Sequence, residues 1–256
     1  MPHFFVSSKD IKGNGVLIRG GEAKHIVTVL RKKKGDEIDI FDGCGNEFRV
    51  RILEIDRLGG FPRIKANIIA QKGGETEPKL KITLFQSIPK GNKLDFIIQK
   101  ATEIGVSEIV PITTERTIVR LDYKKKKNKA IRWQKIAQEA AKQSRRNFIP
   151  QVGSVLDFPQ ALKEFSEGKP QMGIIAWEME DKNYLREVLR SSVGCGISHF
   201  HLAIFIGPEG GFTPEEVEKA RRAGVVPVSL GPRILRTETA GLVVAMVALY
   251  ESSDLG

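Results

Sequence analysis

Two short segments in the last quarter of the chain have the residue types of a ligand-binding loop. Residues 206–213 read Ile-Gly-Pro-Glu-Gly-Gly-Phe-Thr, and residues 230–239 read Leu-Gly-Pro-Arg-Ile-Leu-Arg-Thr-Glu-Thr. Glycine has no side chain in the way, so the backbone amides of such turns can approach a ligand closely. Each segment follows an apolar run, where open α/β sheets bind their ligands just outside the strand ends. The two segments therefore predict one cofactor pocket, lined from two neighbouring strand ends.

The chemistry of this pocket follows from the side chains around the glycines. Gly231 and Pro232 predict a rigid turn, and Ile234 and Leu235 supply flat apolar walls of the kind that bind an adenine-type ring. The glycine spacing fits neither the phosphate-binding loop of nucleotidases nor the dinucleotide fingerprint, so neither ligand is favoured. The alternative for each segment on its own is an ordinary turn.

Arg236 and Glu238 stand at the start of the last predicted helix, residues 237–250. A carboxylate suits the positive end of a helix dipole and an arginine does not, so Arg236 is better explained by a ligand or an RNA phosphate. The alternative is a simple charge pair. The helix itself is apolar nearly all round, which indicates a deep core position or a subunit contact.

Positive charge is concentrated in the middle of the chain. The sequence of 256 residues has a formal net charge of +10, and residues 81–150 alone hold 16 Lys and Arg against 6 Asp and Glu. A basic region beside a neutral to acidic remainder is typical of a protein that binds a polyanion, above all nucleic acid. The alternative is that the lysine run 124–129 is a solvated loop that aids solubility.

The elements that would position these segments fall into two groups. The first 75 residues predict a β-rich unit, with strands at 4–6, 37–41, 47–55 and 63–70, a turn at 42–46 and a helix at about 22–30. The polar stretch 72–78 predicts a domain boundary. Beyond it, strands at 80–86, 109–112, 173–176, 202–206 and 225–230 alternate with helices at 93–104, 128–145, 214–223 and 237–250. This alternation predicts an α/β fold whose mostly parallel sheet has helices on both faces.

Several classes of protein have no support in the sequence. No signal-peptide pattern and no apolar run long enough for a bilayer occur, so we expect a cytoplasmic protein without a membrane partner. The two cysteines form no pair motif and the four histidines no ligand spacing, so no metal site is expected. No Ser/His/Asp or Cys/His arrangement can be read, which leaves hydrolase chemistry without support.

Several long segments together resemble one known family. They are residues 206–213 and 230–239, KGNKLDFIIQKATEIGV at 90–106, PITTERT at 111–117, RWQKIAQEAAKQSRRNFIP at 132–150, and HIVTVLRKKKGDEIDIFD at 25–42. In this order they resemble the RsmE-type ribosomal RNA uridine-N3 methyltransferases of the SPOUT class, over nearly the whole chain. The family often has Arg-Phe-Phe-Val near the start, where this chain has His3-Phe4-Phe5-Val6. If that arginine contacts RNA, the contact here is weaker and depends on pH.

The resemblance implies a PUA-like RNA-binding barrel at residues 1–74 and a methyltransferase domain with a deep trefoil knot at 75–256. It implies S-adenosylmethionine as cofactor, a homodimer with each cofactor site near the interface, and a uridine in 16S ribosomal RNA of the small subunit as target, hence a part in ribosome biogenesis.

The site residues that follow from the resemblance form three sets. The cofactor would contact Ile206, Gly207, Pro208, Glu209, Gly210, Leu230, Gly231, Ile234, Leu235, Arg236 and Thr237. Arg236 is the candidate for stabilising the anion of the reacting base and Glu238 a candidate proton acceptor. The RNA would contact Lys90, Lys93, Gln99, Lys100, Glu103, Arg116, Arg145, Arg146 and Asn147.

Two alternatives compete with this interpretation. One is an RNA-binding ribosome-assembly factor without enzymatic activity, whose glycine segments are structural. The other is a ribose 2′-O-methyltransferase of the same class, which the cofactor segments alone do not exclude. A pure binding protein has no need for two glycine loops at strand ends, and the order and length of the matching segments favour the uridine-N3 enzyme.

Overall fold

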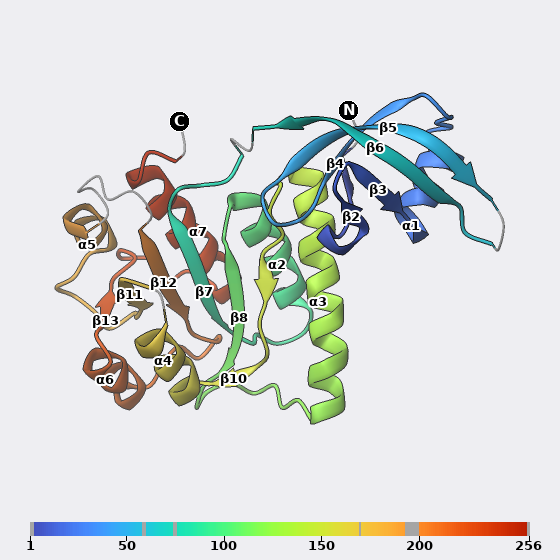
Figure 1. Ribbon diagram of the computed structural model, residues 1–256. Coiled ribbons are helices and arrows are strands. Elements are labelled where there is room, and N and C mark those ends of the chain that lie inside the picture. The colour runs from blue at the N-terminus through green and yellow to red at the C-terminus, as the bar shows by residue number, and fades with distance from the viewer. Residues whose placement is uncertain (1–2, 58–59, 74–75, 169, 193–199, 255–256) are drawn as a thin grey trace. The chain divides into compact units, whose positions relative to one another are not determined.

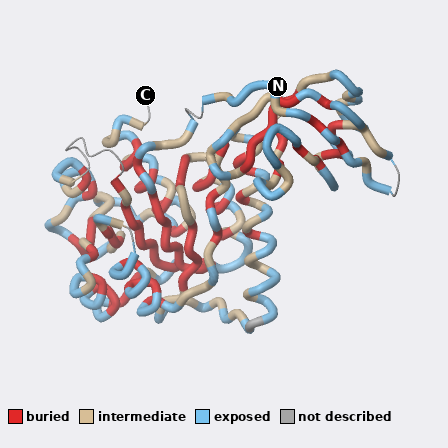
Figure 2. Tube along the Cα trace, viewed as in Figure 1, coloured by how far each residue is buried: buried red, intermediate tan, exposed pale blue. Residues whose placement is uncertain are grey.

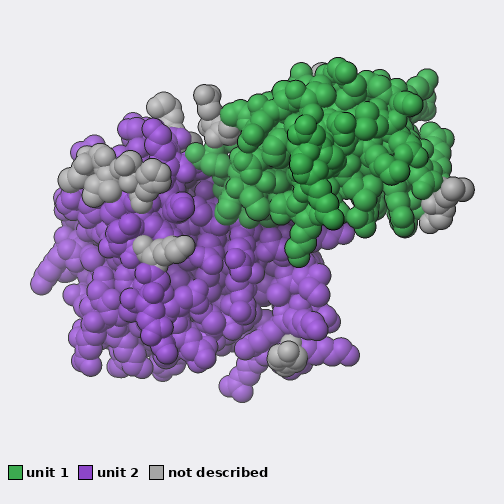
Figure 3. Space-filling model, viewed as in Figure 1, with its two compact units in different colours: residues 1–77, 141–149 green, residues 78–140, 150–256 purple. Residues whose placement is uncertain are grey.

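The computed structural model describes residues 3–57, 60–73, 76–168, 170–192 and 200–254. The chain divides into two compact units (Figure 3): residues 1–77 with 141–149, and residues 78–140 with 150–256. The predicted boundary between residues 74 and 75 falls outside the described residues, as do Cys195 and His199. No sequence pattern predicted that a segment from the middle of the chain belongs to the first unit.

The first unit is built on a curled six-stranded sheet. Its spatial order is β1 (His3–Phe5), β4 (Glu37–Phe41), β5 (Glu47–Asp56), β6 (Arg63–Lys72), β3 (Gly15–Ile18) and β2 (Ile11–Lys12). All neighbours are antiparallel except β1 and β4. Buried Val50 and Ile52 alternate with exposed or partly exposed residues along β5, because successive side chains point to opposite faces. The β-rich prediction is confirmed, although β2 and β3 were not predicted.

The helix predicted at residues 22–30 is shorter and changes its winding. α1 spans Gly20–Lys24, and the chain continues as a turn of π-helix over His25–Val29. Ala23 and Ile26 bury against the sheet and explain the helical spacing of the apolar residues. In the turn at 42–46, the Asp42 carboxylate accepts hydrogen bonds from the backbone amides of Cys44 and Asn46. This local bonding is what an aspartate at the head of a turn supplies.

His3 lies inside the first unit. Its ring stacks on Phe41 with 4.3 Å between the ring centroids. Burial lowers the pKa of His3, and Glu47 and Asp39 only partly oppose this effect. The imidazole is therefore mostly neutral at pH 7, and a charge contact of this residue with RNA would need a more acidic solution.

The second unit is a parallel sheet with helices on both faces (Figure 1). The strands lie in the order β10 (Leu156–Asp157), β8 (Glu108–Thr113), β7 (Lys81–Ser87), β12 (His201–Ile206), β11 (Met172–Ala176) and β13 (Val225–Val228), and β9 (Gln151–Val152) also pairs with β8. Every pairing is parallel. The helices are α2 (Lys93–Ile104), α3 (Tyr123–Ser144), α4 (Phe158–Glu167), α5 (Leu185–Ser192), α6 (Pro214–Arg222) and α7 (Thr237–Glu251). The predicted fold class is confirmed.

The core of the second unit lies on both faces of the central strands, which Figure 2 shows as a buried band. On one face Phe85 and Phe205 stack with 4.4 Å between their centroids and pack against α4 and α6. On the other face Leu84 and Ile206 lie against Gly241 of α7, which also packs on α2. Strands buried on both sides read as continuous apolar runs, which is why the sequence revealed them.

Two helix starts follow directly from capping chemistry. At α6 the Thr213 hydroxyl accepts a hydrogen bond from the Glu216 amide at 3.2 Å, and the Glu216 carboxylate accepts one from the Thr213 amide at 3.0 Å. At α3 the Asp122 carboxylate accepts a hydrogen bond from the Lys125 amide at 2.8 Å, the arrangement of a helix N-cap. The lysine run therefore forms the first turns of α3 and is not the loop that the alternative interpretation supposed, since lysine is a good helix former. The helices α4 and α5 were not predicted.

Candidate cofactor-binding site

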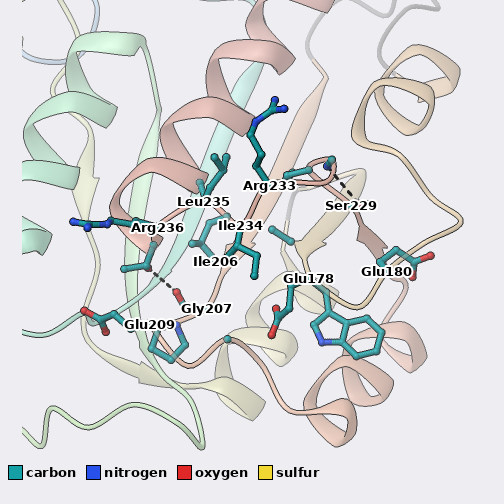
Figure 4. Close-up of a pocket in the computed structure, with 18 of the residues that line it drawn as sticks. Glu178, Glu180, Ile206, Gly207, Glu209, Ser229, Arg233, Ile234, Leu235 and Arg236 are labelled. Carbon is teal, nitrogen blue, oxygen red and sulfur yellow. Dashed lines mark hydrogen bonds between the residues drawn. The ribbon is translucent and has the colours of Figure 1, made fainter.

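One cavity of about 850 Å³ lies in the second unit, at the carboxyl ends of β12, β11 and β13. Its walls come from the loops that follow these three strands, here called the β12, β11 and β13 loops, and from the starts of α2 and α7. Figure 4 shows Gly207 of the β12 loop, Glu178 of the β11 loop and Ile234 of the β13 loop around a common space. The lining also includes Ala176, Trp177, Glu180, Asp181, Tyr184, Ser229, Pro232, Arg233, Ala240, Gly211 and Lys93.

The two predicted loops meet, although their strands are not neighbours. β11 pairs with β12 on one side and with β13 on the other, so it separates them. The prediction of adjacent strand ends was therefore wrong in this respect, because the order of parallel strands cannot be read from their order along the chain. The β11 loop, residues 177–184, fills the gap and supplies residues that the sequence reasoning missed. A tryptophan and three acidic residues directly after a predicted strand were the available signal.

The β12 loop is a tight turn that only glycine permits. The Gly211 amide donates a hydrogen bond to the Pro208 carbonyl at 3.0 Å, and Gly211 has a φ of +66°. A Cβ at Gly211 would lie 2.6 Å from Oε1 of Glu178. A Cβ at Gly207 would lie 3.2 Å from the Gly211 backbone. The glycines therefore allow this loop to fold on itself and to pack closely against the β11 loop.

Buried polar contacts hold the β11 and β13 loops together. The Trp177 amide donates to the Val228 carbonyl at 3.1 Å, and the Ser229 amide donates to the Asn183 carbonyl at 2.8 Å. The buried Glu180 accepts hydrogen bonds from the Asn183 amide at 3.1 Å and from the Arg221 guanidinium at 2.8 Å. Glu180 is therefore engaged in holding its own loop, and Glu178 is the acidic side chain of this loop that lies against the glycine turn.

Lys93, at the start of α2, links the β12 loop to the first turn of α7 through its ammonium group. Its Nζ lies 3.2 Å from a carboxylate oxygen of Glu209 and 3.2 Å from one of Glu238. Hydrogen bonds to these carboxylates raise the pKa of Lys93. A hydrogen bond from its own backbone amide, at the start of α7, lowers the pKa of Glu238, and Lys93 adds to that effect. All three groups are thus charged at neutral pH.

The pKa of Glu209 is lowered as well. Burial by itself would raise it, but hydrogen bonds from backbone amides and from Lys93 outweigh that effect. One of these backbone donors is the amide of Lys90, at 3.1 Å from Oε1 of Glu209. Glu209 was predicted as a cofactor contact, and it lies on the cavity wall as a fixed negative charge.

All eleven residues predicted to contact the cofactor line this cavity: Ile206, Gly207, Pro208, Glu209, Gly210, Leu230, Gly231, Ile234, Leu235, Arg236 and Thr237. Their side chains differ in what they offer. Ile234 is 87% exposed and free to cover a ligand, whereas Ile206 is buried in the cavity floor. Arg236 is the residue before α7, and its side chain is 83% exposed and 4.0 Å from Glu238. The hydroxyl of Thr237 donates to the Gly207 carbonyl at 2.6 Å and is therefore already engaged.

The residues predicted to contact RNA separate into groups. In the second unit, Lys90 and Lys93 lie beside Glu209, and the Arg116 guanidinium donates to the Gly210 carbonyl at 2.7 Å. These three surround the β12 loop. Gln99, Lys100 and Glu103 lie further along α2, where Lys100 pairs with Glu103 at 2.7 Å, and none of the three lines the cavity.

Arg145, Arg146 and Asn147 belong to the first unit. Arg145 is exposed, with a φ of +60°, and its predicted RNA contact stays a prediction. The Arg146 side chain is only 5% exposed and donates to Glu77 at 2.7 Å, while the Asn147 amide donates to the other oxygen of Glu77 at 3.1 Å. Arg146 and Asn147 thus take part in the packing of their own unit, and their predicted RNA contacts stay predictions.

The cavity suits an organic ligand that carries charges of both signs. Its volume lies within the range of about 300–1,000 Å³ usual for such sites. Apolar walls from Ile206, Leu235 and Trp177 stand beside carboxylates and cationic groups. Among the described residues, no group of three His, Cys, Asp or Glu side chains could hold a metal ion, and no helix is long and apolar enough to cross a membrane.

Sequence comparisons place both units. Residues 76–249 match the model of an RNA methyltransferase domain, and residues 18–59 match that of an RNA methyltransferase PUA domain. The chain is 36% identical to ribosomal RNA small subunit methyltransferase E of Bacillus subtilis, covering 93% of this chain and 91% of that protein. It is 31% identical to the protein of the same name from Aquifex aeolicus, covering 96% and 98%.

Solved structures agree with this assignment. A ribosomal RNA small subunit methyltransferase E from Neisseria gonorrhoeae bound to S-adenosylmethionine superimposes with a TM-score of 0.78 at 31% identity, covering 97% of each chain. A methyltransferase from Legionella pneumophila with bound S-adenosylmethionine gives a TM-score of 0.80 at 29% identity, again over 97% of each chain. With both units matched and the relatives aligned over nearly their full length, this chain belongs to the ribosomal RNA small subunit methyltransferase E family of RNA methyltransferases.

Proposed function

We propose that this protein transfers a methyl group from S-adenosylmethionine to N3 of a uridine in the 16S ribosomal RNA of the small subunit. The observation that carries the proposal is the cavity of about 850 Å³ walled by three loops at adjoining strand ends, in a chain of this family. Relatives crystallised with S-adenosylmethionine support the choice of cofactor.

The residues present fit this cofactor. Its adenine ring suits the apolar walls formed by Ile206, Leu235 and Ile234, and its cationic groups suit the carboxylates on the β11 and β12 loops. Glu178 is the best placed of these carboxylates, because it lies against the glycine turn and points into the cavity (Figure 4). When bound, the cofactor supplies a methyl group on a sulfonium that is already activated for transfer.

The protein must then align the uridine, exclude water and manage one proton. In the transfer the N3–H bond of uridine breaks and its proton passes to solvent, an N3–CH₃ bond forms, and the S–CH₃ bond breaks with its electron pair left on sulfur. We assign Arg236 to stabilising the N3 anion, because its exposed guanidinium at the start of α7 can reach an incoming base. Glu238 is a poor proton acceptor, since its pKa is lowered and it is paired with Lys93. We therefore assign it to holding Lys93 at the cavity rim.

Binding titrations test the cofactor site first. The natural protein should bind S-adenosylmethionine in a calorimetric titration and should not bind ATP. A Gly231→Trp variant should lose binding, because φ at Gly231 is +96° and an indole there would enter the cavity. Binding to ATP, or equal binding by the variant, would contradict the placement of the cofactor.

Product mapping tests the position of the methyl group. After reaction with 16S ribosomal RNA, N3-methyluridine should stop reverse transcription at one site, because the methyl group blocks Watson–Crick pairing. Nucleoside mass spectrometry should give the same base. A ribose-methylated nucleoside would favour the 2′-O alternative, and no product with bound cofactor would favour the assembly factor. We expect Arg236→Ala to lower kcat/KM by about 10- to 100-fold, the loss of one charge-assisted interaction.

We also propose a homodimer through α7. Val243, Met246 and Tyr250 are exposed at helical spacing on this helix, whereas Val244 and Leu249 are buried. A continuous apolar stripe of this kind marks a contact surface. Light scattering should give about twice the chain mass of 28.5 kDa, and Met246→Glu should give a monomer. A monomeric natural protein would contradict the dimer without touching the cofactor site.

A further inference from the structure

A glutamine lies fully buried under the cavity without lining it. Gln86 is the next-to-last residue of β7 in the middle of the parallel sheet, and its exposure is 0%. Its Nε2 donates hydrogen bonds to the Ser87 carbonyl at 3.1 Å and to the Thr237 hydroxyl at 3.0 Å. That hydroxyl in turn donates to the Gly207 carbonyl at 2.6 Å, and a dashed line in Figure 4 ends at the labelled Gly207.

The direction of this hydrogen-bond chain is determined by its members. A carbonyl oxygen can only accept, so the Thr237 hydroxyl must give its single proton to Gly207. The hydroxyl must then accept from Gln86, and the Ser87 carbonyl also requires a donor. The nitrogen of the Gln86 amide therefore faces both partners, and a flipped amide would break two hydrogen bonds.

α7 is close enough for this chain because of Gly241. A Cβ at Gly241 would lie 3.2 Å from Oε1 of Gln86, 3.2 Å from Leu84 and 3.3 Å from Ile206. Glycine in a helix interior is unfavourable by about 1 kcal/mol relative to alanine. Its presence where α7 lies so near to Gln86, Leu84 and Ile206 indicates that this close packing matters more than helix propensity.

The chain of hydrogen bonds joins the two glycine loops of the cofactor site to a strand beneath the site. Gly207 is the first residue of the β12 loop, and Thr237 follows the β13 loop as the first residue of α7. Both loops line the cavity, whereas Gln86 is anchored in β7, a strand that supplies no lining residue. A leucine could fill the same space in an otherwise apolar core. A buried amide here therefore needs a reason beyond packing.

We propose that Gln86 is a positioning residue that fixes the spacing of the β12 and β13 loops through Thr237 and Gly207. The inference rests on the proposed function, because it gives these loops their role in binding S-adenosylmethionine. Gln86 acts from below the site and does not touch the cofactor.

Calorimetric titration with S-adenosylmethionine tests the proposal. Gln86→Leu should raise the Kd by about 5- to 30-fold, the effect of one or two buried hydrogen bonds. Thr237→Val removes the same link from its other side and should act similarly, and the double variant should be no weaker than the worse single variant. Thr237→Ser keeps the hydroxyl and should therefore lose less affinity for S-adenosylmethionine than Thr237→Val does. Unchanged Kd in Gln86→Leu, or full additivity of the two changes, would overturn the proposal.

Hydrogen exchange of the ligand-free protein supplies a readout that does not depend on cofactor binding. Peptides covering residues 207–211 and 230–239 should exchange about 5- to 30-fold faster in Gln86→Leu, while the other peptides of the unit keep their rates. Thr102→Val is the matched control, because Thr102 is a buried threonine whose hydroxyl bonds the Ile98 carbonyl within α2. Thr102→Val should leave the exchange rates of both loops unchanged.

These experiments test separately the proposed binding of S-adenosylmethionine and the proposed positioning role of Gln86. If the natural protein fails to bind S-adenosylmethionine, the proposed function loses its cofactor, and the exchange rates still decide the role of Gln86. If loop exchange in Gln86→Leu equals that in Thr102→Val, the positioning role is refuted even where cofactor binding is present. If Gln86→Leu does not fold, Thr237→Val cuts the same hydrogen bond and its exchange rates decide in its place.

Discussion

Gly211 is the position at which one added methyl group tests the geometry of the site. We predict that Gly211→Ala destabilises the protein moderately and weakens cofactor binding more than its effect on stability explains. Two separate terms act there: the backbone φ of +66° and the carboxylate of Glu178, 2.6 Å from the position of the new Cβ.

The size of each term can be worked from the structure. A residue with a Cβ in the left-handed region is unfavourable by about 1–2 kcal/mol. For a unit of this size that corresponds to a fall in Tm of about 2–8 °C. The carboxylate is the end of a flexible side chain and can move away, so the contact adds little to the loss of stability. Its movement, however, displaces Glu178 within the cavity where the cofactor is proposed to bind.

Gly224 provides a matched control outside the site. It follows α6 with a φ of +84°, and apart from its two chain neighbours nothing described lies within 4 Å of a Cβ built there. Gly224→Ala thus carries the backbone term alone. Thermal unfolding should give similar shifts for both variants, and calorimetry should show about tenfold weaker binding of S-adenosylmethionine only in Gly211→Ala. Equal Kd in the two variants would refute the reasoning that Glu178 and the β12 loop form one wall of the site.

Three further predictions concern charge. The charges of Lys93 and its partners Glu209 and Glu238 should make cofactor binding no more or less tight between about pH 5 and 10. The carboxylates lose their charge only below the ordinary glutamate pKa of 4.5, as pH falls through their lowered pKa values, and the lysine only above its ordinary pKa of 10.5, as pH rises through its raised pKa. Calorimetry across this range measures the Kd, and a step in Kd near neutrality would contradict the prediction. Arg146→Ala should destabilise the first unit by about 1–3 kcal/mol in denaturant unfolding, because Glu77 loses its charged partner and keeps only the hydrogen bonds from two backbone amides. The exposed Arg145→Ala should leave stability nearly unchanged while weakening RNA binding. Replacing residues 124–127 by glutamine should raise thermal stability slightly, because lysines oppose the dipole at the start of α3, and should flatten the dependence of RNA affinity on salt; an unchanged salt slope would leave the lysine run as a solubility device.

The parts of the fold that the sequence predicted are those set by local physical rules. The helix α2 spans the predicted residues 93–104, because Gly105, with a φ of +121°, ends it. The helix α6 begins as predicted, because Thr213 and Pro214 are a cap and a first-turn residue. The strands of the parallel sheet stood out because both of their faces are buried.

The parts that were missed depend on contacts between distant segments. No local pattern places β11 between β12 and β13, so the β11 loop and Glu178 could not be assigned to the cavity. Arg146 carried the charge of an RNA contact, and only its burial against Glu77 reveals a structural role. The sequence pattern places Gln86 at the end of an apolar strand, but its role depends on a hydrogen bond to Thr237, 151 residues away. The trefoil knot and the dimer stay predictions.

These observations locate the determinants of the site below its surface rather than on it. The β12 and β13 loops present glycine turns and apolar edges to the cavity, so much of their part in recognition must come from the backbone and from the distance between the turns. The distance between the two turns is set by the residues that pack beneath them. Here that is the hydrogen bond between Thr237 and Gly207, the amide of Gln86 and the close approach at Gly241. Substitution of an exposed side chain such as Ile234 removes only its own contact with the ligand. Substitution of a buried residue in this hydrogen-bond chain moves both turns at once. Substitutions under the cavity should therefore disturb cofactor binding more than most substitutions that line it.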